Sequence, residues 1–156
     1  MLHEPANDFS KLWTTLAASR SGQQYAAGVP LFRSGEPCLG IYLVQDGEVQ
    51  LSIPGRKGKD RPMEKARPGS MLGVCEAVSG SVYKVSAATL STATVIFVER
   101  EHLLTLLRQD PESAMQVVRW LGQKLDVLYR ECQASSGKCR EAASRRLDRG
   151  SHLRPN

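Results

Sequence analysis

Several features that define whole classes of protein are missing from this 156-residue sequence. No apolar run approaches the roughly 20 residues that a membrane-spanning helix needs, so we expect no membrane partner. The N-terminal segment MLHEPANDFSK has no basic stretch followed by an apolar one, which a secretory signal requires. We therefore expect a cytoplasmic protein.

Cysteine and histidine are scarce and scattered. The four cysteines and three histidines are Cys38, Cys75, Cys132, Cys139, His3, His102 and His152. The cysteines form neither a C-x-x-C metal pair nor a dense disulfide framework, and we expect reduced thiols. A redox-sensitive thiol is the alternative for Cys75, and a bond to its twin in a dimer is the alternative for Cys132. Because no histidine cluster and no Ser-His-Asp arrangement is present, we expect no metal site and no enzyme.

The net charge of +5 is concentrated in two segments. One is the stretch 55–67, GRKGKDRPMEKAR, and the other is the C-terminal stretch 138–156. Each has six Lys or Arg residues against two acidic ones. Clustered basic charge attracts phosphate groups, and a solvated loop and tail are the alternative.

Short runs rich in apolar residues occupy the middle of the chain. Their sequences are YAAGVPLF, GIYLVQ, EVQLSI, YKVSAATL and TATVIFV. Strands this short, at near-regular spacing, predict a sandwich or roll rather than alternating βαβ units. Asp46-Gly47 lies between GIYLVQ and EVQLSI, where it predicts a tight hairpin because glycine accepts a positive φ. We expect the polar stretch PGRKGKDRP that follows to be a loop.

Helical spacing is found on both sides of this β region. Phe9, Leu12, Trp13 and Leu16 predict a short amphipathic helix. A second helix is predicted over 99–109, and a third begins at Pro111 because the residue before proline avoids the helical region. The third helix, predicted over 111–133, carries a seam with heptad spacing: Ala114, Val118, Leu121, Leu125, Leu128 and Cys132. Such a seam favours a parallel helix-pair dimer, and packing on its own domain is the alternative.

The order of these elements, together with three motifs, resembles the cyclic-nucleotide-binding, or Crp/Fnr-type, sensor domain of transcription regulators. The motifs are RSGEPCLGIYLVQDGEVQLSI over 33–53, RPGSMLGVCEAVSG over 67–80 and VIFVEREHLLTLLRQDPE over 95–112. The resemblance implies a jelly-roll β-roll, mainly β with flanking helices, including a long C-terminal dimerisation helix. It divides the chain into an N-terminal helix and link (1–22), a sensor domain (23–110), a dimerisation helix (111–133) and a basic, disordered tail (134–156).

In this family a strand-to-helix turn forms the phosphate-binding cassette, where N–H groups and an arginine hold the phosphate and a glutamate accepts the ribose hydroxyl. The resemblance places it at Leu72, Gly73, Val74, Cys75, Lys84, Val85 and Ser86. Gly73 matches the cassette glycine, but Val74 takes the glutamate position and Lys84 lies at or next to the arginine position. Valine accepts no hydrogen bond and lysine lacks the bidentate fork, which argues against ordinary cAMP binding. A pocket for another ligand and a filled pocket remain equal alternatives.

Three functions are consistent with this sequence. The first is an effector-sensing domain of a dimeric Crp/Fnr-type regulator, which takes a cyclic nucleotide or another small anionic effector. The second is a ligand-free dimerisation or interaction module. The third is nonspecific nucleic-acid binding through the basic tail. The residues after 133 are too few for the family's winged helix-turn-helix, so we expect sequence-specific DNA binding only if such a domain is restored.

Overall fold

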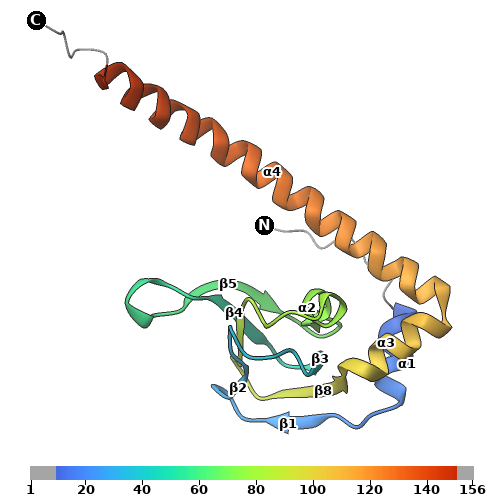
Figure 1. Cartoon of the computed structure of the whole chain (residues 1–156). Coiled ribbons are helices and arrows are strands. Elements are labelled where there is room, and N and C mark those ends of the chain that lie inside the picture. The colour runs from blue at the N-terminus through green and yellow to red at the C-terminus, as the bar shows by residue number, and fades with distance from the viewer. Residues whose placement is uncertain (1–9, 151–156) are drawn as a thin grey trace, which may run out of the picture. The chain divides into compact units, whose positions relative to one another are not determined.

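The computed structural model describes residues 10–150, with side chains from 11 to 135 (Figure 1). The chain has two compact units, one ending at Val117 and one starting at Val118. The first unit holds the strands, the short helices and the start of the long helix. The second unit consists of the rest of the long helix.

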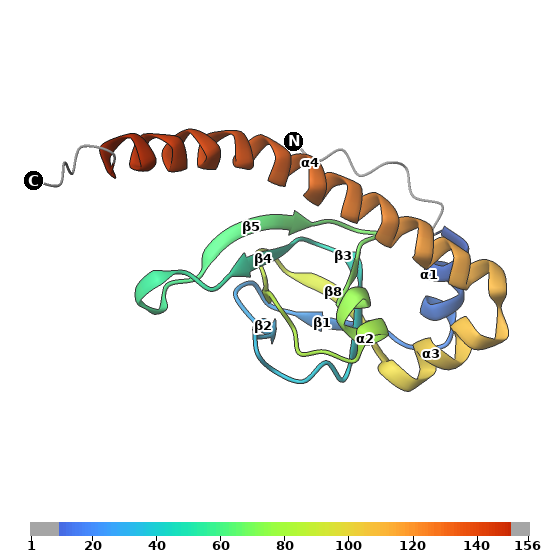
Figure 2. The same cartoon turned by 45° about the horizontal axis from the view of Figure 1, so that its top comes forward.

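Between residues 23 and 99, eight strands form two antiparallel sheets of four (Figures 1 and 2). The strands are β1 (Gln23–Tyr25), β2 (Pro30–Phe32), β3 (Gly40–Asp46), β4 (Val49–Ile53), β5 (Arg61–Ala66), β6 (Met71–Leu72), β7 (Ser86–Thr89) and β8 (Ala93–Glu99). One sheet has the order β1-β8-β3-β6 and the other β2-β7-β4-β5. The predicted fold, mainly β with flanking helices, is confirmed.

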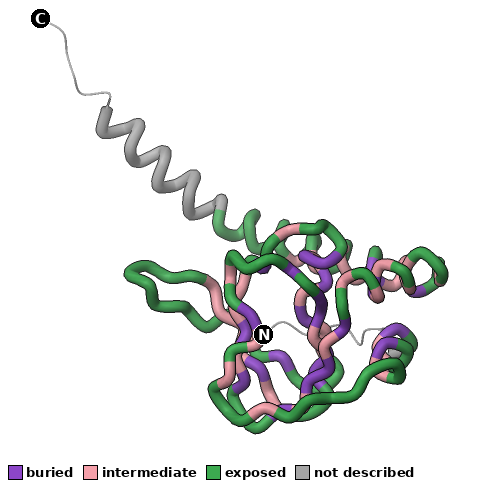
Figure 3. The backbone as a smooth tube through the Cα atoms, turned by 60° about the horizontal axis from the view of Figure 1, so that its bottom comes forward, coloured by how far each residue is buried: buried purple, intermediate pink, exposed green. Residues whose placement is uncertain are grey.

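The core of the first unit is built mainly by β3 and β8. Both strands are apolar runs, and they pair with each other from Gly40↔Glu99 to Asp46↔Thr94. Besides the small Ala93, their buried side chains are Ile41, Leu43, Val44, Val95, Ile96 and Val98. Figure 3 shows this burial as purple stretches within the roll. Burial of each of these larger side chains contributes about 1.5–3 kcal/mol, so this pair makes the largest apolar contribution of any two paired strands.

The Asp46-Gly47 turn joins the two sheets. Gly47 has the predicted positive φ of 81°, but β3 and β4 lie in different sheets, so the predicted hairpin is wrong. The neighbouring loop gives the reason. A Cβ on Gly47 would collide with the Thr92 carbonyl, and the Glu48 N–H donates to Ser91 Oγ at 3.1 Å. These contacts lead the chain across to the second sheet.

The two predicted short helices are confirmed as α1 (Ser10–Ala18) and α3 (Arg100–Gln109). α1 buries Leu12 and Leu16, as its apolar spacing predicts, and α3 buries Leu103. Phe9 of the predicted apolar face lies outside the described residues. A further short helix, α2 (Val74–Ser79), follows β6.

The long helix, α4 (Pro111–Gly150), begins at the predicted proline and runs past its predicted end at Gln133. The predicted disordered tail is therefore wrong for residues 134–150, while 151–156 lie outside the described residues. The stretch ASSGKCREAASRRLDR contains no proline and is rich in alanine and arginine. These residues have high helix propensity, so a helix that is already nucleated propagates through them.

β5 is a strand that the sequence pattern does not predict. It begins inside PGRKGKDRP, which was expected to be a loop, and only the 3₁₀ turn η1 (Arg56–Gly58) precedes it. Its sequence, RPMEKA, lacks an alternating apolar pattern, yet it pairs with β4 from Val49↔Ala66 to Ile53↔Arg61. The partner strand sets its conformation. Its place at the edge of the sheet explains why Pro62 is tolerated.

Candidate functional site

β6, Gly73 and α2 form a strand–turn–helix unit at the place predicted for the phosphate-binding cassette. Gly73 has a φ of 87°, a left-handed conformation that favours glycine. A Cβ at this position would lie 3.0 Å from the Tyr83 ring and 3.3 Å from the Gly40 carbonyl oxygen. The turn thus needs glycine both for its backbone angle and for its close packing.

The predicted site residues differ in exposure. Those that are half-buried are Gly73, Cys75, Val85 and Ser86. Leu72 and Val74 are buried, and Val74 has only 1% of its surface exposed. Lys84 is exposed. At the start of α2, the chain therefore places an apolar side chain in the interior at the position where the resemblance expects a carboxylate.

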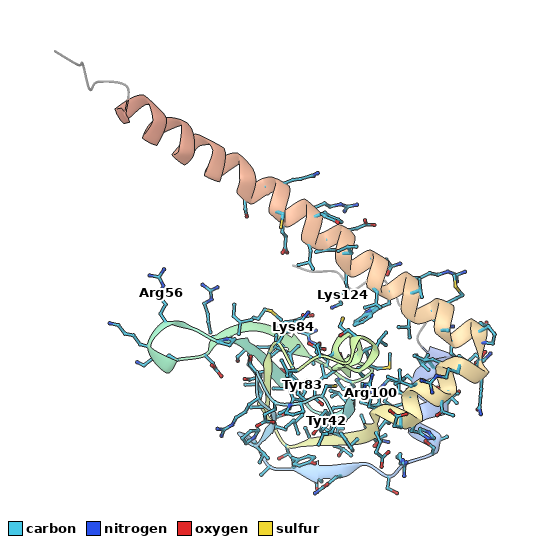
Figure 4. All side chains as sticks on the ribbon, viewed as in Figure 1. Tyr42, Arg56, Tyr83, Lys84, Arg100 and Lys124 are labelled. Carbon is cyan, nitrogen blue, oxygen red and sulfur yellow. The ribbon has the colours of Figure 1, made fainter. Side chains whose placement is uncertain are left out.

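Lys84 is not the side chain that enters the roll. It is exposed, and its carbonyl accepts a hydrogen bond from Ser34 Oγ at 3.2 Å. The Ser34 N–H donates to Ser86 Oγ at 3.0 Å, so two hydrogen bonds hold this loop against the start of β7. Lys84 lies in a bend before β7, and the neighbouring residue that points inward is Tyr83 (Figure 4).

Tyr83 packs against the inner side of the turn. Its residue is 4% exposed, its ring stacks on Phe32 with 4.0 Å between centroids, and its hydroxyl donates to Gly40 O. The Cys38 thiol donates to the same carbonyl at 3.4 Å and to Gly73 O at 3.8 Å. Burial raises the pKa of Tyr83 above its ordinary value of 10.0, which keeps the phenol protonated, and thus a hydrogen-bond donor, further into alkaline solution. The protein's own side chains thus occupy space directly behind the turn.

Aromatic contacts continue from Phe32 into the other sheet. The Tyr42 ring on β3 lies 5.5 Å from Phe32 on β2 and 5.1 Å from Phe97 on β8, between centroids. The Tyr42 hydroxyl donates to Leu31 O at 3.2 Å, and burial raises the pKa of Tyr42. Aromatic pairs contribute about 0.5–1.5 kcal/mol beyond their buried area. The row therefore ties the two sheets together behind the turn.

Arg100 connects α2 to α3. It is the first residue of α3, its N–H donates to Leu39 O at 2.9 Å, and its Nε donates to Ala77 O at 2.7 Å. A Cβ on Gly80, which ends α2, would lie 3.2 Å from Arg100 Nη2. A cation at this end also complements the helix dipole. The end of α2 is thus held to α3 by one side chain (Figure 4).

Asp110 connects α3 to α4 and caps the start of α4. Its Oδ2 accepts from the hydroxyl of buried Ser113 at 2.7 Å, and its Oδ1 accepts from the Glu112 N–H at 3.2 Å. The hydrogen bond from Ser113 holds the pKa of Asp110 below its ordinary value. On α1, Lys11 pairs with Glu112 at 2.8 Å, and this hydrogen-bonded ion pair raises the pKa of Lys11. These contacts anchor the first turn of α4 in the first unit.

The predicted dimer seam of α4 is largely exposed. Its exposed members are Val118, Leu125, Leu128 and Cys132, and its half-buried members are Ala114 and Leu121. Val118 is 58% exposed, Leu125 50% and Leu128 56%. The large apolar side chains of Met115 and Tyr129 are exposed on the same helix. Contiguous exposed apolar surface marks an interaction site more often than scattered apolar residues do.

The sequence reasoning missed Tyr83, Cys38 and Arg100. A signal for Tyr83 was present in YKVSAAT, because strand alternation predicts one side for Tyr83, Ala87 and Thr89, and all three are buried. The same alternation assigns Lys84 to the opposite side. No sequence signal marks Arg100, since its contacts depend on α2, α3 and the loop before β3 meeting in space.

The residues that the structure describes hold no group of three or more His, Cys, Asp or Glu side chains arranged to bind a metal ion. Within that same part of the chain, no helix combines the length and the apolar character needed to cross a bilayer. His102, on α3, has its Nε2 3.3 Å from Ser19 Oγ.

The model of the family described as "Cyclic nucleotide-binding domain" matches residues 22–110. The chain is 32% identical over 104 residues to patatin-like phospholipase domain-containing protein 6 of Mus musculus, a match that covers 62% of this chain and 8% of that protein. It is 27% identical over 101 residues to the cyclic AMP receptor protein of Thermus thermophilus, covering 65% of this chain and 47% of that protein. The chain thus spans less than half the length of these relatives.

Among solved structures, the catabolite activator protein of Thermus thermophilus is similar to this chain, with a TM-score of 0.72 and 24% sequence identity. The similarity covers 86% of this chain and 62% of that chain. It supports the same arrangement of two antiparallel sheets with flanking helices and a long C-terminal helix.

Proposed function

The chain belongs to the cyclic nucleotide-binding domain family, and from this premise we propose that it is the effector-sensing domain of a Crp-like regulator. In this proposal a small anionic effector binds at the β6–α2 turn, and α4 forms a parallel dimer that transmits the bound state. The domain acts in the cytoplasm and has no catalytic role. The observation that carries the proposal is the β6–Gly73–α2 turn, tied to α3 through Arg100.

An anionic effector suits this turn for two reasons. The first N–H groups of a helix have no partner within the helix, and they favour negative charge. α2 begins directly after Gly73, and the exposed Lys84 adds a positive charge on the segment that leads into β7. A cyclic nucleotide or another small phosphate or carboxylate compound has the required chemistry.

Ordinary cAMP is expected to bind weakly. Buried Val74 accepts no hydrogen bond from a ribose hydroxyl, and the exposed Lys84 offers no bidentate contact to a phosphate. Each missing charge-assisted hydrogen bond is worth roughly 1.5–3 kcal/mol. Loss of both is enough to change a micromolar dissociation constant to about a millimolar one.

A second candidate function is a dimerisation module that needs no ligand. It is favoured by the buried Val74 and Tyr83, which fill space behind the turn. The third candidate, nucleic-acid binding through the tail, depends on cations from Lys138 onward, whose side chains lie outside the described residues.

A route from the turn to the dimer helix supports the sensor proposal. Arg100 bonds α2 to α3, Asp110 joins α3 to α4, and Ser113 seats the first turn of α4 on that carboxylate. A rearrangement of α2 would therefore change the position of α3 and the start of α4. The exposed apolar seam of α4 then supplies the surface through which a second copy would be affected.

Thermal unfolding of the full chain with a panel of cyclic mononucleotides and cyclic dinucleotides tests the proposal. A ligand present at 100 times its dissociation constant stabilises the folded state by about 2.7 kcal/mol. We expect at least one compound to raise the melting temperature, with cAMP acting only at millimolar concentration. Lys84→Glu should reverse the charge beside the effector and so make the shift smaller. The apparent dissociation constant should rise at least about tenfold.

Arg108→Glu is the matched control, because Arg108 is an exposed cation in the last turn of α3 and is not part of the predicted site. It should leave the ligand-induced shift unchanged. A flat response across the panel, with the chain still dimeric, would reject the effector proposal in favour of the ligand-free module.

A further inference from the structure

The stretch 56–67, here called the basic hairpin, is one of the two segments in which the chain's net positive charge is concentrated. It comprises η1, residues 59 and 60, β5 and the residue that follows β5. Its six cations and two anions give it a net charge of +4. The C-terminal stretch 138–156 has the same net charge, so the rest of the chain is acidic, with a net charge of −3. The positive charge is therefore segregated from the body of the domain.

All six cations of the basic hairpin are exposed. They are Arg56, Lys57, Lys59, Arg61, Lys65 and Arg67. None of them takes part in an ion pair with another described side chain. The loop between β4 and β5 extends away from the roll, and Arg56 lies at its tip (Figures 3 and 4). The charge is thus available to a partner.

At the tip of the loop, a lysine occupies a left-handed backbone conformation that is unfavourable for residues other than glycine. A Cβ on Gly55 would collide with the Lys59 carbonyl, so the loop closes tightly on itself. Lys57 has a φ of 63° and Gly58 a φ of 73°. The left-handed region favours glycine or asparagine at such a position, yet the chain places a lysine there.

Protection of the sheet edge does not account for this pattern. β5 is an edge strand, and Lys and Pro on an edge prevent pairing with other chains. Edge protection explains Pro62 and Lys65. However, it requires only charged residues or proline within the strand, and the charge can have either sign. It gives no reason for the cations of the tip, which precede β5.

We propose that the basic hairpin binds the surface of an anionic lipid bilayer. Cations near such a surface are attracted by its negative potential, and an exposed apolar side chain adds affinity by entering the interface. Met63, within the stretch, is 51% exposed, and the exposed Pro62 lies beside it. The expectation of no membrane partner rested on the absence of a spanning segment, whereas this contact is peripheral.

The composition of the stretch disfavours nucleic acid as the partner. Residues 54–67 contain no Ser, Thr, Asn or Gln side chain to bond bases or sugars. They also contain no aromatic ring on which a base could stack. Only phosphate attraction would remain, and it would make no use of Met63.

Binding of the full chain to phosphatidylcholine vesicles with 30% phosphatidylserine, against vesicles of phosphatidylcholine alone, tests the proposal. We expect binding to the anionic vesicles only, weakened by salt. The triple variant Arg56→Gln, Lys57→Gly, Lys59→Gln should bind about 100-fold more weakly, since each cation near the surface contributes about fivefold. Lys57→Gly alone should lower affinity about fivefold while leaving the unfolding midpoint unchanged or higher, because glycine adopts the observed φ more easily.

The matched control removes the same charge from exposed sites elsewhere: Arg33→Gln, Arg108→Gln and Arg130→Gln. It should retain vesicle affinity within about twofold, since these cations lie outside the hairpin. Met63→Ser should weaken vesicle binding without a change of charge and leave any binding to duplex DNA unaltered. The proposal is overturned by a lack of binding to anionic vesicles, by equal binding to neutral ones, or by loss of duplex DNA binding in the triple variant with vesicle binding intact.

Discussion

Two valines, one at the start of α2 and one in α4, lie in opposite environments. Val74, at the start of α2, is 1% exposed, whereas Val118 on α4 is 58% exposed. The roll buries an apolar side chain where the family resemblance expects a carboxylate for the ribose. α4 leaves apolar side chains in water where a surface helix normally carries polar ones. The first region completes its packing within one chain, and the second does not.

The difference shows which of the two regions has apolar surface left for a partner or ligand to bury. Behind the turn, Tyr83 and Phe32 stack, and the Cys38 thiol lies within hydrogen-bond distance of two backbone carbonyls. The packing of this region therefore needs no ligand. On α4, Val118 and Leu125 are about half exposed, so burial of the rest of each side chain by a partner would contribute roughly 1 kcal/mol. The exposed face of α4 therefore has more apolar surface left for a partner to bury than the inside of the roll has for a ligand.

The largest effect is expected from changing the α4 seam. Leu125→Asp places a carboxylate at the centre of the proposed dimer interface, where burial of an unpaired charge costs several kcal/mol. We expect the dimer dissociation constant to rise about 100-fold or more. Sedimentation velocity over a concentration series measures it.

Leu90→Asp is the control for this change, because Leu90 is 44% exposed in a loop of the roll and lies outside the seam. It should leave the oligomeric state unaltered. If the wild-type chain is monomeric at all concentrations, the dimer proposal is rejected. The exposed seam of α4 would then not be an interface between two copies of this chain.

The next largest effect is expected inside the roll. Val74→Glu would bury a carboxylate among apolar neighbours and should lower the free energy of unfolding by about 2–4 kcal/mol. Val78→Glu is the same change on the same helix at a residue that is 39% exposed, and it should cost less than about 0.5 kcal/mol. Urea unfolding of both variants gives the two values. Equal effects would show that the start of α2 is open to water and that the turn is not filled.

The parts of the molecule that could be predicted are those whose structure follows from local sequence patterns. Apolar periodicity is local, so it revealed α1, α3, the start of α4 and most of the strands. The seam of α4 was also visible, since heptad spacing survives whether or not a partner is present. The jelly-roll fold followed from the motifs around Gly47 and Gly73.

The remaining features depend on contacts between distant segments. The Asp46-Gly47 turn has the local signal of a hairpin, but the loop that holds Ser91 and Thr92 directs it to the other sheet. β5 takes its conformation from β4. Arg100 gains its role only because α2 and α3 meet. For Tyr83, the alternation of apolar and polar positions in YKVSAAT did predict an inward side chain. The interpretation instead followed the family's arginine position, which pointed to Lys84.

The smallest predicted effect lies at Asp110, where the self-contained roll passes into α4. The hydrogen bond from Ser113 lowers the pKa of Asp110 below its ordinary value of 3.8, so the folded state favours the charged carboxylate. The stabilisation is fully present above that ordinary value and is lost as the pH falls through the lowered one. Asp110→Asn should therefore be slightly less stable than the wild type at pH 7, with the difference disappearing as the pH falls below 3.8.

Ser113→Ala removes the donor that lowers this pKa, and it should lose the same pH-dependent part of the stability. In the double variant the second change should add little to that part, because both act on one hydrogen bond. Thermal unfolding between pH 2 and pH 7 measures the three variants. A stability difference that stays constant over this range would mean that Asp110 acts on α4 only as a polar cap, and that its charge does not help to anchor the helix in the first unit.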